Sequence, residues 1–171
     1  MGLAESADDF IVLGNIIHGL YLCIVMKIEE AIGQPSFESP QHRAGMNILF
    51  TANWLLSRYE AALKPLGLSL QQLNVLAILR GQPSGTATVN LVRERMIDRM
   101  PNVSRMLNKL MEKGLVAKER TASDQRVVYI KLTARGEKVA VKGREIFRSV
   151  EIGLSSKEAE ALSGLLEKLR E

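Results

Sequence analysis

The chain has 171 residues, 46% of them hydrophobic, and a formal net charge of +4. This is sufficient for a domain with its own hydrophobic core. The single cysteine, Cys23, excludes an internal disulfide framework and indicates a reducing, cytoplasmic location. The two histidines, His18 and His42, supply too few ligands for a dedicated zinc site, so we expect no metal and no other cofactor.

The charge is unevenly distributed along the chain. Residues Arg93–Arg148 contain 15 Lys and Arg against 7 Asp and Glu, whereas the remainder contains 8 against 12. A basic middle between acidic flanks predicts a module that binds a polyanion such as nucleic acid. The terminal segments are expected to serve another purpose.

The first strongly apolar stretch is Phe10–Val25. It is too short to span a bilayer comfortably, and it contains Asn15 and His18. Acidic residues precede it, where a secretory signal carries basic ones. Three interpretations stay open: a helix buried at a subunit interface, a poorly packed extension, or sequence upstream of a natural start at Met26. We expect no association with a membrane.

Two helices are predicted before the first pronounced break. A short one covers Met26–Ile32, and after a loop over Gly33–Ser39 a long one runs from about His42 to Leu63. The segment Lys64–Gly67 contains Pro and Gly and ends the long helix. Helical spacing places several apolar residues of the long helix on one face, with Trp54 as a bulky anchor: Ile48, Leu49, Ala52, Leu55, Leu56 and Tyr59.

The next helix has a clear start signal. Ser69 followed three residues later by Gln72 predicts a capping box, and the helix is expected to reach Leu79. A short strand is predicted at Thr86–Thr88, after a turn rich in Gly and Pro. The apolar residues expected to face the core are Leu73, Leu76, Ala77 and Leu79.

A pair of helices follows, one within Thr88–Met100 and one over Pro101–Gly114. The N-cap of the second helix is either Asp98, with Pro101 in the first turn, or Met100, with Pro101 at the first helical position. Gly114 suits the left-handed residue that ends a helix. Apolar residues recur at three- and four-residue spacing in Val103, Met106, Leu107, Leu110 and Met111. The residues off this stripe are Asn102, Ser104, Arg105, Asn108 and Lys109.

Two strand-like segments, Leu115–Arg120 and Arg126–Leu132, flank a turn over Thr121–Gln125. Two helices followed by a basic hairpin are the layout of a winged helix-turn-helix. A helix with a polar, basic leading end fits the major groove of DNA, where amides, hydroxyls and guanidinium groups reach base edges and phosphates. A solvated amphipathic helix is the alternative interpretation for the helix taken alone.

Two more helices complete the chain. Thr133 is expected to cap a helix that runs to about Val150, and Ser155 or Ser156 to cap the last one. The last helix has an apolar stripe of Leu162, Leu165, Leu166 and Leu169. Together with the long helix at His42–Leu63 it offers more apolar surface than a small DNA-reading head needs, which predicts pairing with a second copy.

From about Met26 to the end, the chain resembles the multiple-antibiotic-resistance regulator (MarR) family of bacterial transcription factors. The resemblance is carried by LKPLGLSLQQLNVLAILRGQP and by RMLNKLMEKGLVAKERTASDQRVVYIKLTARGE. Its most specific part is Ser123-Asp124-Gln125-Arg126, which is similar to the D-x-R signature of the family's wing. The resemblance implies that Asp124 shapes the wing and that Arg126 reaches the minor groove. It also implies a homodimer on a near-palindromic operator, with one helix in each major groove.

Candidate site residues follow from the residue pattern and the resemblance together. Those expected to bind double-stranded DNA are Asn102, Ser104, Arg105, Asn108, Lys109, Arg120, Ser123, Asp124 and Arg126. The basic residues Arg105, Lys109, Lys118, Arg120, Arg126 and Lys131 are expected near one surface. The family resemblance also suggests a small aromatic or phenolic effector, for which the candidate residues, each with plain core packing as the alternative, are Met46, Phe50, Trp54 and Tyr59.

The predicted fold is mainly α with a small β-hairpin wing, a winged helix-turn-helix with N- and C-terminal dimerisation helices. The expected divisions are an extension over 1–25, dimerisation helices over 26–64, a DNA-binding domain over 65–133 and dimerisation helices over 134–171. We expect a regulator, a repressor rather than an enzyme, because the sequence has no Gly-rich phosphate loop, metal-ligand cluster or Ser-His-Asp set. The alternative is a winged-helix module that binds proteins without specific DNA binding.

Overall fold

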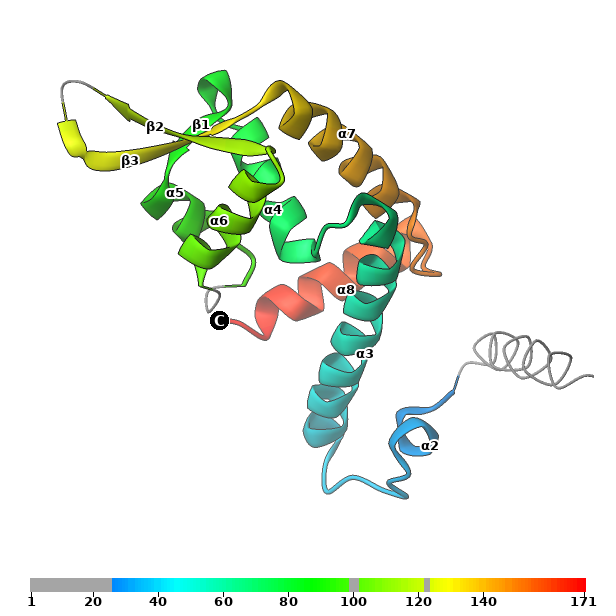
Figure 1. Ribbon diagram of the computed structural model, residues 1–171. Helices are drawn as coiled ribbons and strands as arrows, with labels where there is room; N and C mark the ends of the chain where they lie inside the picture. Colours follow the sequence, from blue (N-terminus) through cyan, green and yellow to red (C-terminus); the bar gives the residue numbers. More distant parts are fainter. Residues whose placement is uncertain (1–25, 99–101, 122–123) are drawn as a thin grey trace, which may run out of the picture. The chain divides into compact units, whose positions relative to one another are not determined.

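The computed structural model describes residues 26–98, 102–121 and 124–171 (Figure 1). For residues 120, 121 and 124–126 it describes the backbone. The apolar stretch Phe10–Val25, with Cys23 and His18, lies outside the described residues. The chain divides into two compact units, Met1–Trp54 and Leu55–Glu171, and helix α3 (Pro40–Leu63) contributes to both. The division of function at residues 64 and 133 stays a prediction.

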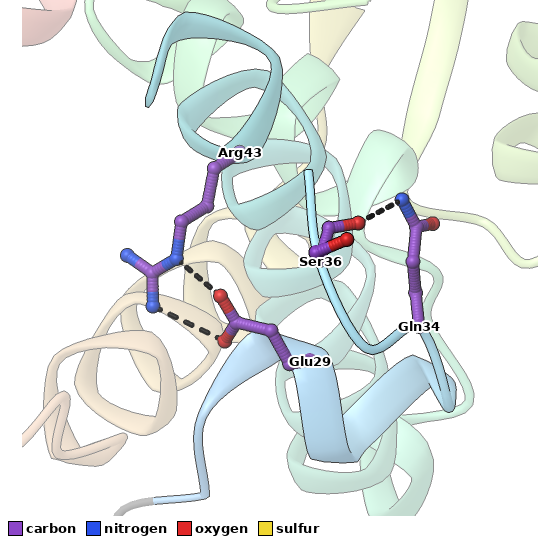
Figure 2. Close-up of polar contacts among 4 residues, drawn as sticks. All are labelled: Glu29, Gln34, Ser36 and Arg43. Carbon is purple, nitrogen blue, oxygen red and sulfur yellow. Dashed lines mark hydrogen bonds and ion pairs between the residues drawn. The ribbon is translucent and has the colours of Figure 1, made fainter. Parts of the chain in front are cut away.

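The first unit contains the short helix α2 (Ile28–Ile32) and the beginning of α3. A two-pronged ion pair joins them: the Arg43 guanidinium donates to both carboxylate oxygens of Glu29, at 2.6 and 3.2 Å (Figure 2). Hydrogen bonding from Arg43 holds the pKa of the Glu29 carboxyl below its ordinary value. In the connecting loop, the Gln34 side-chain amide donates to the Ser36 carbonyl at 2.9 Å (Figure 2).

Helix α3 begins at Pro40, two residues before the predicted His42, because Ser39 caps it. The Ser39 hydroxyl accepts from the His42 N–H at 3.1 Å, and the Ser39 carbonyl accepts from the Arg43 N–H at 3.0 Å. Proline is favoured in the first helical position, where its missing N–H costs nothing. The predicted end at Leu63 is confirmed, and the one-turn 3-10 helix η1 (Lys64–Leu66) follows.

The second unit is built around helix α4 (Leu70–Arg80). Its predicted capping box is confirmed: the Ser69 hydroxyl accepts from the Gln72 N–H, and the Gln72 side chain accepts from the Ser69 N–H, both at 3.2 Å. Ala77, predicted to face the core, is exposed, whereas Val75 and Ile78 are buried. The prediction was wrong because α4 contacts α5, α7, β1 and β3, so its buried surface is wider than one stripe.

The strands form a three-stranded antiparallel sheet in the order β1-β3-β2. Strand β1 (Thr86–Thr88) confirms the predicted short strand, and it precedes helix α5 (Val89–Arg95), which Thr88 caps. The hairpin consists of β2 (Val116–Thr121) and β3 (Asp124–Leu132). Its strands extend further than predicted, so the connection is shorter than the expected turn over Thr121–Gln125.

Helix α6 (Val103–Glu112) is the second helix of the helix-turn-helix pair. Its N-cap is Asn102, whose side-chain oxygen accepts from the Arg105 N–H at 3.1 Å, so both predicted caps, Asp98 and Met100, were wrong. The predicted role of Gly114 is confirmed by its φ of 66°. The Gly114 N–H donates to the Met111 carbonyl at 2.8 Å, which closes the last turn.

These elements share one hydrophobic core. In Figure 1 helices α4, α5 and α6 lie together, and the β2–β3 hairpin extends away from them. The two helices of the pair contribute Val92, Val103, Leu107 and Leu110, each at most 3% exposed. The other core residues are Leu68, Val75, Leu76, Ile78, Leu79, Ala87, Met96, Leu115, Val116, Ile130 and Ala140. Mainly helical structure with this small sheet confirms the predicted winged helix-turn-helix.

Helix α7 (Ala134–Ser149) returns along α4, and Thr133 caps it as predicted. It approaches closely because Gly136, Ala140 and Gly143 are buried on one side of it. Helix α8 (Ser156–Lys168) starts with a capping box between Ser155 and Glu158. Hydrogen bonds from Ser155 hold the pKa of the Glu158 carboxyl below its ordinary value.

Several leucines of α8 and its C-terminal end are exposed. The exposed fractions are 45% for Leu162, 68% for Leu165 and 67% for Leu169. Within the described part of the chain, no single helix is long and apolar enough to cross a membrane. Only Pro40–Leu66 taken together with Leu70–Arg80, across a bend of 74°, meets both requirements.

Candidate nucleic-acid interface

The outer face of helix α6 carries the polar residues that the sequence predicted there. Val103, Leu107 and Leu110 are buried, and Met106 and Met111 are half-buried. The residues off this stripe are all exposed: Asn102, Ser104, Arg105, Asn108 and Lys109. The helix therefore offers amides, a hydroxyl and two cations on one accessible side, which is the donor and acceptor set that reads DNA base edges and phosphates.

Asn102 has a structural role that the sequence analysis did not assign to it. Its side-chain oxygen caps α6 by accepting from the Arg105 N–H. The side-chain NH₂ group is not needed for this cap, so it can still donate to a base or a phosphate oxygen. The same interaction fixes the first turn of the helix, which carries Ser104 and Arg105, at the end expected to lead into the groove.

A surface hollow of about 390 Å³ adjoins this face. It lies between the start of α4 and the side of α6, and two of its lining residues, Arg105 and Lys109, are cationic. The full lining is Ser69, Gln71, Gln72, Asn102, Arg105, Met106 and Lys109. The sequence analysis treated Ser69 and Gln72 only as a helix cap and overlooked Gln71, because nothing local indicates that the start of α4 lies beside α6.

The wing separates two lysines that were expected on one surface. The β2–β3 register places Lys118 opposite Ile130 and Ala117 opposite Lys131, so Lys118 and Lys131 lie on opposite faces of the sheet. The Lys131 ammonium is paired with the Glu119 carboxylate at 2.9 Å. The expectation of one common basic surface was therefore wrong for Lys131.

The predicted wing contacts fall mostly outside the part that the structure describes. Arg120 lies near the end of β2, and Asp124 and Arg126 lie at the start of β3. Their side chains, and Ser123 as a whole, are outside the described residues. The register is irregular between Arg120 and Thr121, where Thr121 pairs with Asp124. Their roles in DNA binding stay predictions.

The proposed effector residues differ in their surroundings. Met46 and Trp54 are half-buried, whereas Phe50 is 41% exposed, so plain core packing does not describe Phe50. Tyr59 stacks on Phe147 of α7, with ring centroids 4.1 Å apart and an interplanar angle of 8°. None of the four lines the hollow beside α6 or a second hollow of about 400 Å³ between α2 and the start of α3.

The search for other chemistry in the described residues gives a plain result. Among residues 26–98, 102–121 and 124–171, no group of three or more His, Cys, Asp or Glu is placed to hold a metal ion. The concentration of cationic and amide groups on α6 is thus the main chemical feature of the head.

The family model described as Transcriptional regulator SarA/Rot matches residues 57–142, half of the chain. The chain belongs to this family of transcriptional regulators. The match contains α4, the helix-turn-helix pair, both strands of the wing and the first half of α7.

Solved structures of MarR family regulators share the fold, which confirms the predicted resemblance at that level. Sco5413, a MarR family transcriptional regulator from Streptomyces coelicolor, matches with a TM-score of 0.68 and 23% identity, over 77% of this chain and 93% of its own. A mutant of MarR from E. coli, complexed with operator DNA, matches with a TM-score of 0.63 and 23% identity, over 73% and 91%.

A third similar structure contains a small molecule. The organohalide-sensing regulator RdhR-CbdbA1625, in its 2,4-dichlorophenol bound form, matches with a TM-score of 0.68 and 22% identity. The alignment covers 78% of this chain and 86% of that protein. At this level of identity the similarity establishes the fold of the SarA/Rot family member described here, and its ligands are matters for proposal.

Proposed function

We propose that this SarA/Rot family regulator is a sequence-specific DNA-binding repressor that acts as a homodimer on a near-palindromic operator, without enzymatic activity, in the cytoplasm. The observation that carries the proposal is the division of α6 into a buried apolar stripe and an exposed face of amide, hydroxyl and cationic groups. The E. coli MarR mutant of the same fold is bound to operator DNA. Both point to α6 as the helix that reads the major groove.

The division of labour on α6 follows from side-chain chemistry. Arg105 can donate two parallel hydrogen bonds to a guanine edge, and Asn108 can pair with an adenine edge. Lys109, with a compact charge on a flexible stem, suits a phosphate oxygen. Phosphate contacts fix the position of the helix and base contacts supply specificity. In the wing, Arg126 extends toward the minor groove and Asp124 orders the turn.

A second copy and an effector complete the proposed mechanism. The exposed leucines of α8 supply a self-complementary surface, and a two-fold dimer presents two α6 helices to two half-sites. A small aromatic or phenolic effector, held by Met46, Phe50, Trp54 and Tyr59, would release the operator. A related fold binds 2,4-dichlorophenol, which makes this ligand class the first one to test.

The alternative function is a winged-helix module that binds proteins and has no specific DNA site. A gel shift with genomic fragments at two salt concentrations separates the two functions. A DNA-binding regulator retards particular fragments and loses affinity steeply as salt rises. A module that binds only proteins retards none of them.

The first test concerns the reading face of α6. Arg105→Ala and Asn108→Ala should each weaken operator binding by about 1–3 kcal/mol, because each removes a base contact. Both side chains are exposed, so the melting temperature should stay unchanged. The affinity for an operator selected from genomic DNA is measured by fluorescence anisotropy. Lys157→Ala on α8 removes an exposed cation outside α6 and serves as the control. Wild-type affinity in both α6 variants would refute the assignment of this face.

The second test separates two roles in the wing. Arg126→Ala should reduce operator affinity and lower the salt dependence by about one unit of slope, because one cation leaves the DNA. Asp124→Ala should also weaken binding, although it removes a negative charge beside DNA, because a carboxylate near a turn accepts hydrogen bonds from its N–H groups or aims a neighbouring guanidinium. Electrostatics alone predicts the opposite sign. Tighter binding by Asp124→Ala would show that this residue only repels DNA.

A further inference from the structure

Lys113, the C-cap residue of helix α6, makes contacts far away in the sequence. Its ammonium group donates to the carbonyl oxygen of Gly67 and, at 3.1 Å, to the side-chain oxygen of Gln72. Gly67 follows η1 directly, in a left-handed conformation with φ of 61°. One cation therefore ties the end of the reading helix to the segment that joins α3 to α4.

The acceptor on Gln72 is unusual for its burial. Gln72 is 6% exposed and is the one buried polar side chain among the described residues. Its side-chain oxygen accepts from both the Ser69 N–H and Lys113, so the same atom closes the cap of α4 and holds the end of α6. Such a buried acceptor is costly to leave unpaired.

The favourable effect of a cation near a helix C-terminus does not explain this arrangement. That effect needs only a positive charge near the last turn of its own helix. Lys113 instead donates to two acceptors outside its helix, 46 and 41 residues away in sequence. The interaction therefore constrains the relative placement of two helices, and both contribute to the hollow beside Arg105 and Lys109.

We propose that Lys113 is a positioning residue for operator recognition: it fixes the angle of α6 against the start of α4, so that Arg105 and Asn108 meet base edges in one orientation. The inference rests on the DNA-binding function proposed above. Base contacts depend steeply on geometry, whereas the attraction to phosphates is long-ranged and independent of sequence. Loss of Lys113 should therefore reduce the discrimination between operator and other DNA more than it reduces affinity for DNA in general.

The test compares two lysines of the same helix. Lys113→Met removes the ammonium and keeps an unbranched side chain of similar length. Lys109→Met makes the same chemical change on the exposed face. Affinities for the selected operator and for a scrambled duplex of equal length are measured by fluorescence anisotropy at several salt concentrations. Lys113→Arg, which keeps a cationic donor, tests whether the function returns.

We expect Lys113→Met to lower operator affinity on the order of tenfold, the usual size of a lost charged hydrogen bond. Its affinity for scrambled DNA should change less than about twofold, and its salt slope should be that of wild type. Lys109→Met should weaken binding to both duplexes and lower the slope by about one. Lys113→Arg should restore most of the discrimination. If Lys113→Met does not fold, Lys113→Gln, which keeps a neutral donor, should show the same loss of discrimination in smaller measure.

Two results would overturn the inference while leaving the proposed function intact. One is a Lys113 variant with wild-type discrimination between operator and scrambled DNA. The other is a fall in salt slope equal to that of Lys109→Met, which would make Lys113 a phosphate contact. Wild-type protein that does not distinguish the two duplexes would instead overturn the proposed function, and the inference with it.

Discussion

Gly136→Ala is expected to lower the free energy of unfolding by about 3 kcal/mol, at the upper end of the cost of overpacking. A Cβ atom at Gly136 would lie 2.0 Å from the Leu115 carbonyl oxygen and 2.9 Å from a methyl carbon of Leu132. The carbonyl cannot swing away as a side chain can. It accepts from the Thr133 N–H and from the Thr133 hydroxyl, both at 3.1 Å. Helix α7 must therefore move, or the start of β2 must.

Two other glycines provide matched controls for Gly136→Ala. A Cβ at Gly143 would lie 2.4 Å from a terminal methyl of Leu73, which can change rotamer, so Gly143→Ala should cost less. Gly164 of α8 has nothing within 4 Å, and it lies opposite the leucine stripe of that helix. Gly164→Ala should stabilise by about 0.5–1 kcal/mol, because Ala favours the helix.

Urea unfolding of the three variants at one protein concentration measures these differences. The expected order of stability is Gly164→Ala above wild type, with Gly143→Ala and then Gly136→Ala below it. A Gly136→Ala protein as stable as Gly164→Ala would show that the close approach of α7 to Leu115 is not required by the fold.

Features set by neighbouring residues were predictable from the sequence. The capping box of Ser69 and Gln72, the cap at Thr133, and the start of α8 at Ser155 each depend on hydrogen bonds within three or four residues. The buried stripe and polar face of α6 follow from helical periodicity, which is also local. These features were sufficient to predict the winged helix-turn-helix and the exposed candidate residues on α6.

Features set by distant residues were not predictable in the same way. The stacking of Tyr59 on Phe147 and the bond from Lys113 to Gly67 join segments far apart in sequence. The opposite faces of Lys118 and Lys131 depend on strand parity, which was not traced through the expected hairpin. Even the cap of α6 was misassigned, because Pro101 drew attention to the residues before it and away from Asn102.

Disrupting α8 is expected to produce the largest loss of DNA binding. Leu165 and Leu169 are 68% and 67% exposed in the single chain, which is a high exposure for leucines on one helix face. If this face is covered by a second copy, Leu165→Asp combined with Leu169→Asp places two charges in an apolar interface. The variant should sediment as a monomer, while the wild type sediments as a dimer.

A monomer engages one half-site at a time, so it loses the benefit of linked binding. Operator affinity should fall by a factor on the order of 10² to 10⁴, whereas the reading head keeps its own fold. Ser163→Asp adds a charge to the same helix outside the leucine stripe, and it should leave both the dimer and the affinity unchanged. Sedimentation and anisotropy on the same samples link the two effects. A double variant that remains dimeric, or a monomer that binds the operator as wild type does, would contradict dimerisation through α8 as a requirement for DNA binding.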